Sequence, residues 1–508
     1  MDRIHKKSAI TKSKEMILAA HEQGEALLWG RYEQQLPLCV FTANGLNCRK
    51  CFNGPCRVNP FGDEPSRGIC GADRDQIVME TLFQATLEGI LEMVRSVSLL
   101  NGSGLTQEFP DIAPDLPWET QRKLSEMGLL PVRQEQLFEV QNSYFSHKGY
   151  LSRTIKDLTR LGLIQYGFWK KAEALANTLH QDEPPFDALG ANILLVGQPP
   201  LGLIHSLQNQ PRGKGINLFL AGAKIIPSAP AMADHGTPEL ALAMNLDALV
   251  IAPNSSWPAL ETLTKKFAIP EILIDETKSI DEMTSRAAKL ALGHRRNASY
   301  ITPSRITPRT SSQKMARSFF DKTDEIREAL EAGRIQGIVV MLGEPNVKQT
   351  FFERTLTLME NCLSQGCLVL LGDAWAAQAD LLDEELAKRI PDRRSSQKAY
   401  FSSYEIPEVV VFLKDLSQGK AFASIPAVIA FPEFFRASTW ATAVGFLSLG
   451  FAVQIGTPLP FWGSPAITEI LLKDWPKLSG GTLLASPSLP SSQAQAEEIL
   501  SFLQARQV

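Results

Sequence analysis

The sequence predicts an α/β protein in which an N-terminal helical domain carrying a cysteine-rich loop is followed by two Rossmann-like parallel α/β domains. Three observations lead to this prediction. The first part of the chain has helical apolar spacing, the remainder alternates short apolar β-type runs with helices, and a polar, proline-containing linker divides that remainder in two. We place the domains at residues 1–185, 186–297 and 298–508. With 508 residues, of which 44% are hydrophobic, the chain is long enough to bury several cores.

The helical domain is predicted from apolar residues that recur every three or four positions. This spacing runs through the opening segment and through residues 78–100 and 151–180. Prolines interrupt the pattern between these segments, at Pro110, Pro114, Pro117 and Pro131. Because proline lacks an amide donor and breaks a helix, we expect several helices packed around the cysteine loop rather than a regular bundle.

The two α/β domains are predicted from short runs rich in Val, Ile and Leu. They lie at residues 192–198, 216–224, 247–255 and 271–276 in the first domain, and at 337–344, 367–373, 427–433, 451–457 and 481–487 in the second. Neither domain has a G-x-G-x-x-G turn after its first strand or a G-x-x-x-x-G-K-[ST] loop, so nucleotide binding is not predicted.

A second site, if there is one, is expected at the carboxyl ends of these strands, where open parallel sheets bind their ligands. The residues at those ends are Gln198, Gly222, Ala223, Asn254, Ser255, Glu344, Asp373 and Ala374.

Composition excludes several classes of function. A net charge of −4 and the lack of a long Lys/Arg run argue against nucleic acid as a partner. The N-terminus has no signal-peptide apolar core, and the longest apolar run is too short and too interrupted by glycine to span a membrane. Seven cysteines are too few for a disulfide framework, particularly because five of them lie between Cys39 and Cys70. We therefore expect a cytoplasmic protein in a reducing compartment.

The cysteine-rich loop is the chemically most informative stretch. Cys48, Cys51 and Cys56 form a C-x2-C-x4-C run, and Cys70 follows after a loop rich in glycine and proline. Soft thiolates suit iron–sulfur clusters and zinc, and the turn at Gly54 lets the backbone wrap a compact group. Spacing alone leaves three interpretations open, namely an iron–sulfur cluster, a structural zinc site and thiols without a metal.

The stretch GLNCRKCFNGPCRVNPFGDEPSRGICGA closely resembles the cluster-binding loop of the anaerobic nickel-iron carbon monoxide dehydrogenases, relatives of the hybrid-cluster proteins. The flanking RYEQQLPLC and GAD and the order of the domains are also similar to that family. The resemblance implies that Cys48, Cys51, Cys56 and Cys70 bind a [4Fe-4S] relay cluster. It also implies a homodimer, or a pairing with a related subunit, and a redox partner such as a ferredoxin.

The chain departs from the family at a second cluster that two subunits usually share. Cys39 matches the first of its two cysteines, whereas Asn47 occupies the position of the second. Two copies of the chain therefore lack a four-thiolate shared cluster. Cys39 could face its mate as a free thiol or a bridge, but we expect a plain buried thiol.

The larger departure concerns the family's nickel-iron-sulfur active site. When the strands are aligned with those of the family, Gln198 occupies the position of the family's histidine ligand. The positions of the family's cysteine ligands are occupied by Ala223, Ser255, Glu344, Ala374 and a residue near Tyr404. The remaining cysteines, Cys362 and Cys367, fall on a helix end and a strand start and are expected to be core thiols. The family's acid/base histidines and lysine are also lacking, with Arg436 near the lysine position, and we expect His235 to be a capping or surface histidine.

The leading hypothesis is therefore a carbon monoxide dehydrogenase-like iron–sulfur protein with one [4Fe-4S] cluster and no nickel-iron-sulfur cluster. We expect it not to oxidise CO itself and to act in electron transfer, assembly or regulation under anaerobic conditions. A redox enzyme with a rebuilt site at Gln198, Glu344 and Asp373 is an alternative, although the two acidic residues can instead cap the helices after their strands. A true carbon monoxide dehydrogenase is a third possibility, which the cysteine count disfavours.

Overall fold

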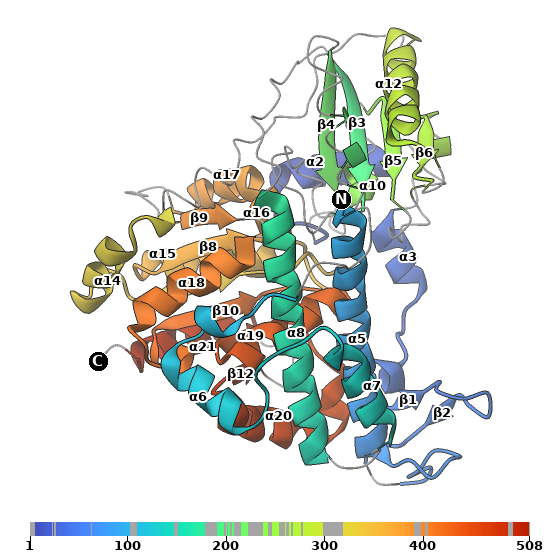
Figure 1. The fold of residues 1–508 in the computed structure, drawn as a ribbon. Coiled ribbons are helices and arrows are strands. Elements are labelled where there is room, and N and C mark those ends of the chain that lie inside the picture. Colours follow the sequence, from blue (N-terminus) through green and yellow to red (C-terminus); the bar gives the residue numbers. More distant parts are fainter. Residues whose placement is uncertain are drawn as a thin grey trace.

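A computed structural model gives the fold of the chain (Figure 1). It describes residues 6–22, 24, 27–61, 63–101, 109–146, 151–177, 190–197, 200, 202–203, 206–207, 215–221, 237–241, 246–252, 260, 264–265, 268–275, 278–297, 319–390, 398–401, 405–485 and 491–506.

The first part of the chain is helical, as predicted, apart from one small hairpin. Its elements are α2 (Thr11–Glu22), α3 (Leu28–Gln34), α4 (Val40–Ala43), β1 (Asn47–Cys48), β2 (Cys56–Arg57), α5 (Arg74–Asn101), the 3-10 helix η1 (Ala113–Asp115), α6 (Trp118–Glu126), α7 (Gln136–Ser146) and α8 (Leu151–Asn177). The two long helices α5 and α8 run side by side and form the axis of this part of the molecule (Figure 1). None of the helices described combines the length and the hydropathy that a membrane crossing needs.

The first α/β unit contains a parallel sheet, which confirms the predicted Rossmann-like layout. Its elements are β3 (Ala191–Val196), β4 (Ile216–Ala221), α10 (Pro238–Ala241), β5 (Ala248–Ile251), β6 (Glu271–Leu273) and α12 (Ile280–Asn297). The strands are ordered β4-β3-β5-β6, and all neighbours are parallel. Apolar side chains of the strands and of α12 form a small core of their own.

The second α/β unit has a longer parallel sheet, ordered β12-β11-β10-β7-β8-β9. Its elements are α14 (Thr323–Glu331), β7 (Ile338–Met341), α15 (Glu353–Ser364), β8 (Leu368–Gly372), α16 (Asp373–Ala377), α17 (Ala379–Arg389), β9 (Lys398–Phe401), α18 (Ile406–Ser417), η3 (Phe422–Ser424), β10 (Ala427–Phe431), α19 (Ala437–Leu449), β11 (Ala452–Ile455), η4 (Pro460–Gly463), α20 (Pro465–Leu478), β12 (Thr482–Ala485) and α21 (Ser492–Gln504). The runs predicted as strands form β7, β8, β10, β11 and β12. The edge strand β9 was not among the predicted strands.

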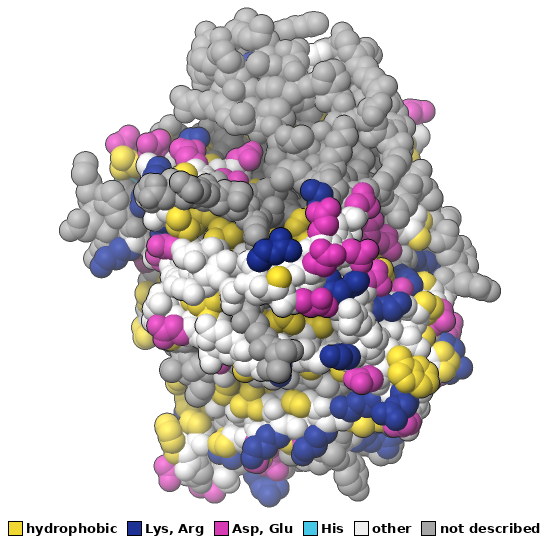
Figure 2. All heavy atoms as spheres, turned by 90° about the vertical axis from the view of Figure 1, so that its left-hand side faces the viewer, with side chains coloured by type: hydrophobic (Ala, Val, Ile, Leu, Met, Phe, Trp, Pro, Cys, Tyr) yellow, Lys and Arg dark blue, Asp and Glu magenta, His cyan; other side chains and the backbone are white. Residues whose placement is uncertain are grey.

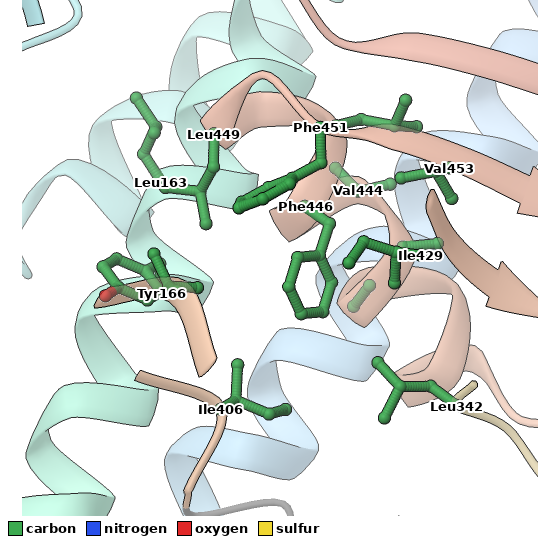
Figure 3. Packing of buried hydrophobic residues seen from close by; sticks show 14 of the residues in the cluster. Leu163, Tyr166, Leu342, Ile406, Ile429, Val444, Phe446, Leu449, Phe451 and Val453 are labelled. Carbon is green, nitrogen blue, oxygen red and sulfur yellow. The ribbon is translucent and has the colours of Figure 1, made fainter. Parts of the chain in front are cut away.

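The helical part and the second sheet share one hydrophobic core, because α19 lies between that sheet and both α5 and α8. Figure 3 shows this core, in which Phe446 of α19 lies between Tyr166 of α8 and Ile429 of β10. The helices approach so closely that a Cβ on Gly89 of α5 would lie 2.4 Å from a backbone oxygen of α19. The helical segment is thus packed as a third layer on the second sheet.

The opposite face of the second sheet is covered partly by the beginning of the chain. Ser8 forms an isolated parallel bridge with Phe351, and the amide of Ala9 donates to the carbonyl of Phe351 at 2.8 Å. Ile10, Ile17 and other apolar residues of the first helices pack in the same cluster as strands β7 and β8. The N-terminal segment therefore spans from the cysteine loop to the far side of the sheet.

Candidate functional site

The cysteine loop is built on the hairpin β1–β2, in which Cys48 lies directly opposite Cys56. The amide of Val58 donates to the carbonyl of Leu46 at 3.0 Å and closes the hairpin at its base. At its tip, the carbonyls of Cys48 and Cys51 both lie 3.3 Å from the point where a Cβ on Gly54 would stand. Glycine therefore permits a turn that brings the backbones of three cysteines around one point.

The fourth cysteine reaches the same neighbourhood through the chain after β2. The amide of Ile69, the residue before Cys70, donates to Cys56 Sγ at 3.4 Å. The turn is held by the amide of Gly68, which donates to the carbonyl of Ala72 at 2.8 Å. Hydrogen bonds from backbone N–H groups to cysteine sulfurs are among the features that tune iron–sulfur clusters. The sequence-predicted ligands thus lie in one loop.

The exposure of the four thiols differs. Cys51 and Cys70 are exposed, and Cys48 and Cys56 are half-buried. Among the described residues, no three His, Cys, Asp or Glu side chains stand close enough together to hold a metal. The four cysteines therefore share one loop, but the described structure does not gather three of them into a preformed metal site.

Cys39 was expected to be a buried thiol, and this expectation was wrong. The side chain is exposed at the start of α4, between Leu38 and Val40, which are exposed as well. Hydrogen bonds from the hydroxyl and amide of Thr42 lower the pKa of the Cys39 thiol. Asn47, by contrast, has a buried side-chain oxygen without a hydrogen-bond partner in the part of the chain that is described.

Only some residues of the predicted strand-end site lie within the described part of the structure. Gln198, Ala223, Ser255 and Tyr404 lie outside the described residues, as does His235. Asp373 is the first residue of α16 and follows β8 directly, as expected for a residue at a strand end. Because Gln198 lies outside the described residues, the rebuilt site proposed at Gln198, Glu344 and Asp373 stays a prediction.

Glu344 follows β7 and is buried, and its contacts are those of a helix cap. Its Oε1 accepts from the amide of Arg436 at 3.1 Å and from the hydroxyl of Thr439 at 3.0 Å. Its Oε2 lies 3.6 Å from Nε of Arg436. These groups form the first turn of α19, so the carboxylate stabilises a helix N-terminus. Glu344 was predicted to cap the helix that follows its own strand, which is α15. It does act at a helix N-terminus, but the helix is α19, which follows β10.

Glu433 is a buried acid at the same edge that sequence reasoning missed. It follows β10, is fully buried, and accepts at Oε2 from the amide of Asn346 at 3.2 Å. Burial raises the pKa of Glu433 to about 8, and the nearby Arg354 only partly offsets this. The sequence offers one signal, since Glu433 follows the apolar run of β10 in the same way that Glu344 follows β7.

Cys362 and Cys367 are both buried, which confirms that they are core thiols. The amide of Cys367 donates to the carbonyl of Cys362 at 2.9 Å across the C-terminus of α15, with Gly366 at φ 76° between them. This is the hydrogen bond that closes a Schellman cap. Both cysteines lie at the amino end of β8, away from the strand ends at which ligands bind.

Acidic side chains line one groove of the described surface. Figure 2 shows Asp and Glu side chains gathered in one area of the described surface, and Lys and Arg side chains gathered below them. A groove of about 520 Å³ between α8, α14 and α18 is lined by Asp115, Lys170, Glu173, Asp321, Glu408 and Asp415, among others. Burial, with Glu408 and Asp115 nearby, raises the pKa of Glu173 to about 7. Such a groove repels phosphates.

Comparison with known proteins finds similarity in the segment that holds the cysteine loop. The Prismane/CO dehydrogenase family matches residues 46–126. Carbon monoxide dehydrogenase 1 of Methanosarcina acetivorans is 45% identical over 83 residues, which are 16% of this chain and 13% of that protein. Carbon monoxide dehydrogenase of Rhodospirillum rubrum is 47% identical over 75 residues, 15% of this chain and 12% of that protein. The alignments thus span about an eighth of these relatives.

The similarity of fold extends much further. Carbon monoxide dehydrogenase IV from Carboxydothermus hydrogenoformans superposes with a TM-score of 0.78 over 99% of both chains, at 18% identity. A nickel-free carbon monoxide dehydrogenase from Thermococcus sp. AM4 gives a TM-score of 0.77 at 18% identity, over 98% of this chain and 97% of that one. Residues 46–126 are therefore similar to the Prismane/CO dehydrogenase family, and the chain has the fold of the carbon monoxide dehydrogenases over nearly its whole length.

Proposed function

We propose that this chain is a carbon monoxide dehydrogenase-like iron–sulfur protein that binds one [4Fe-4S] cluster and acts in electron transfer, assembly or regulation without oxidising CO itself. The observation that carries the proposal is the hairpin in which Cys48 faces Cys56, together with the Ile69 amide that donates to Cys56 Sγ. Cys48, Cys51, Cys56 and Cys70 are the ligands in this proposal. The cluster would accept and release single electrons.

The residues around the loop hold its backbone in place. Lys50 pairs with Glu80 of α5 at 2.6 Å, and the guanidinium of Arg74 donates to the carbonyl of Pro60 at 3.0 Å. The Ile69 amide directs the positive end of its N–H dipole at Cys56 Sγ. This contact would favour the reduced, more negative state of a cluster bound there. Exposed Cys51 and Cys70 leave one side of the loop open to a partner.

Two features support the lack of CO oxidation. The described strand ends carry oxygen groups in place of thiolates, and Glu344 already uses its carboxylate for α19. Beyond the ends of β7 and β10, the described residues line a cavity of about 20 Å³. A heterometal cluster of several atoms needs far more room and soft ligands.

The experiment is the measurement of iron, nickel, zinc and acid-labile sulfide in anaerobically purified protein, with electron paramagnetic resonance of the reduced form. We expect about four irons and four sulfides per chain, without nickel. The variant Cys70→Ser should lose the signal, whereas Cys39→Ser, which changes another exposed thiol of this region, should keep it. Stoichiometric zinc, or iron that survives in Cys70→Ser, would overturn the ligand assignment.

The same metal analysis distinguishes the two alternative functions from the leading proposal. A rebuilt site at Gln198, Glu344 and Asp373 predicts a further metal beyond the cluster, bound by oxygen ligands, that is lost in Glu344→Gln. A true carbon monoxide dehydrogenase predicts nickel and CO oxidation in proportion to it. Absence of both in a preparation with a full cluster supports the leading proposal.

We also infer a self-pairing or related-subunit partner, from the exposed apolar side chains around the cysteine loop. These are Leu36, Leu38, Val40, Phe52, Phe61 and Ile69. Exposed apolar side chains gathered in one region mark interaction sites. A second partner would be a redox protein such as a ferredoxin, and a reducing cytoplasm is the compartment that suits free thiolates. Sedimentation analysis of the anaerobic protein tests the pairing.

A further inference from the structure

A small cavity lies at the joint between the helical part and the second sheet. It is bounded by α5, α8 and α19 and by the carboxyl ends of β7 and β10, and its volume is about 20 Å³. Met93, Trp169, Leu342 and Phe431 supply apolar walls. Carboxyl ends of parallel strands are where sheets of this kind bind ligands, so the contents of this cavity are of interest.

Two polar side chains of the cavity have no hydrogen-bond partner within the described structure. They are Gln165 of α8, through Oε1, and Ser438 of α19, through Oγ, and each residue is only 2% exposed. Buried polar atoms in native proteins are nearly always paired with protein or with ordered water. Their occurrence in the wall of one cavity indicates a shared partner.

The other polar groups of the cavity wall are already engaged. The hydroxyl of Thr439 donates to Glu344 at 3.0 Å, and that of Thr442 donates to the carbonyl of Ser438 at 3.0 Å. Neither hydroxyl hydrogen is therefore left for the amide oxygen of Gln165. That oxygen is an acceptor, so its partner must bring a donor.

We propose that this cavity binds one water molecule, which donates to Gln165 Oε1 and exchanges a second hydrogen bond with Ser438 Oγ. The volume suffices for a single water and not for a larger molecule. A diatomic gas such as CO has no N–H or O–H group and leaves Gln165 unpaired. A monatomic ion would lose its hydration among mostly apolar walls. Water meets the size and both hydrogen-bonding requirements.

The bound water links α8 to the first turn of α19, near the carboxylate of Glu344 that caps the same turn. It thereby completes the polar contacts of a joint whose remaining surface is apolar. In this proposal a structural water molecule therefore occupies the place beyond the carboxyl ends of β7 and β10, where parallel sheets commonly bind ligands. This inference depends on the cavity alone and stands whether or not the loop binds a cluster.

The test is a crystal structure of the full chain at a resolution that shows waters, before and after pressurisation with xenon. We expect one water peak within hydrogen-bonding distance of Gln165 and Ser438, and no xenon. In the double variant Gln165→Met with Ser438→Ala, which removes both hydrogen-bonding partners, the water should be lost. Thr442→Ser, which keeps its hydroxyl, is the control and should keep the water.

The wild-type crystal decides the proposal even where a variant folds poorly. Xenon in the wild-type cavity, an empty cavity, or density for a larger ligand would each overturn it. A direct contact between Gln165 and a protein donor would overturn it as well.

Discussion

Replacing Glu433 by glutamine should stabilise the chain increasingly as the pH rises. The carboxyl is fully buried, one of its oxygens has no partner in the described structure, and burial raises its pKa to about 8 from an ordinary value of 4.5. The folded state therefore holds a proton that the unfolded chain releases. The contribution of this group to stability is fully present below pH 4.5 and is lost as the pH rises through about 8.

The magnitude follows from the difference of one proton between the two states. Each pH unit within this window costs the wild type up to about 1.4 kcal/mol relative to a chain without the titrating group. Between about pH 5.5 and about pH 7.5, Glu433→Gln should gain roughly 2.5 kcal/mol of unfolding free energy over the wild type. For a unit of some 200 residues this corresponds to a rise of about 5–10 °C in Tm.

The assay is thermal unfolding of both proteins, anaerobically and at several pH values, followed by tryptophan fluorescence. The matched control is Glu328→Gln, which removes an exposed carboxyl of α14 in the same unit. It should shift Tm equally at every pH. A Tm difference between Glu433→Gln and wild type that stays constant from about pH 5.5 to about pH 7.5 would refute the buried, protonated carboxyl.

Three further predictions concern other parts of the molecule. Glu344→Ala should cost about 2–4 kcal/mol through the lost contacts to α19 while metal content stays unchanged, and a loss of metal would instead favour the rebuilt site. Gly162→Ala should destabilise by about 1–3 kcal/mol, because its Cβ would lie 2.1 Å from a hydroxyl of α19. Gly293→Ala, in the interior of α12 with no neighbour within 4 Å, should instead stabilise by up to about 1 kcal/mol in urea unfolding. Val40→Asp should weaken self-association in sedimentation, and Leu273→Asp, which alters an exposed apolar residue of β6, should not; equal behaviour of the two variants would count against the interface.

Much of the fold could be predicted from the sequence because its signals are local. Apolar spacing separated the helical part from the parallel α/β part, and the runs predicted as strands became β7, β8, β10, β11 and β12. Strand β9 was missed because its four residues, Lys398–Phe401, contain no long apolar run. The strand signal is limited to one aromatic pair, Tyr400 and Phe401. The cysteine spacing likewise identified the loop, because ligands of one cluster can come from one short segment.

Tertiary structure decided what spacing cannot encode. It placed Glu344 at the N-terminus of α19, joined the helical part and the second sheet in one core, and enclosed Gln165 and Ser438 in one cavity. It also left Cys39 exposed where a buried thiol was expected. The sequence by itself determined most of the elements, their order and the cysteine loop, since these depend on neighbours along the chain. Burial, helix capping across the sheet and the shared cavity depend on which distant surfaces pack together, and only the folded chain decides that.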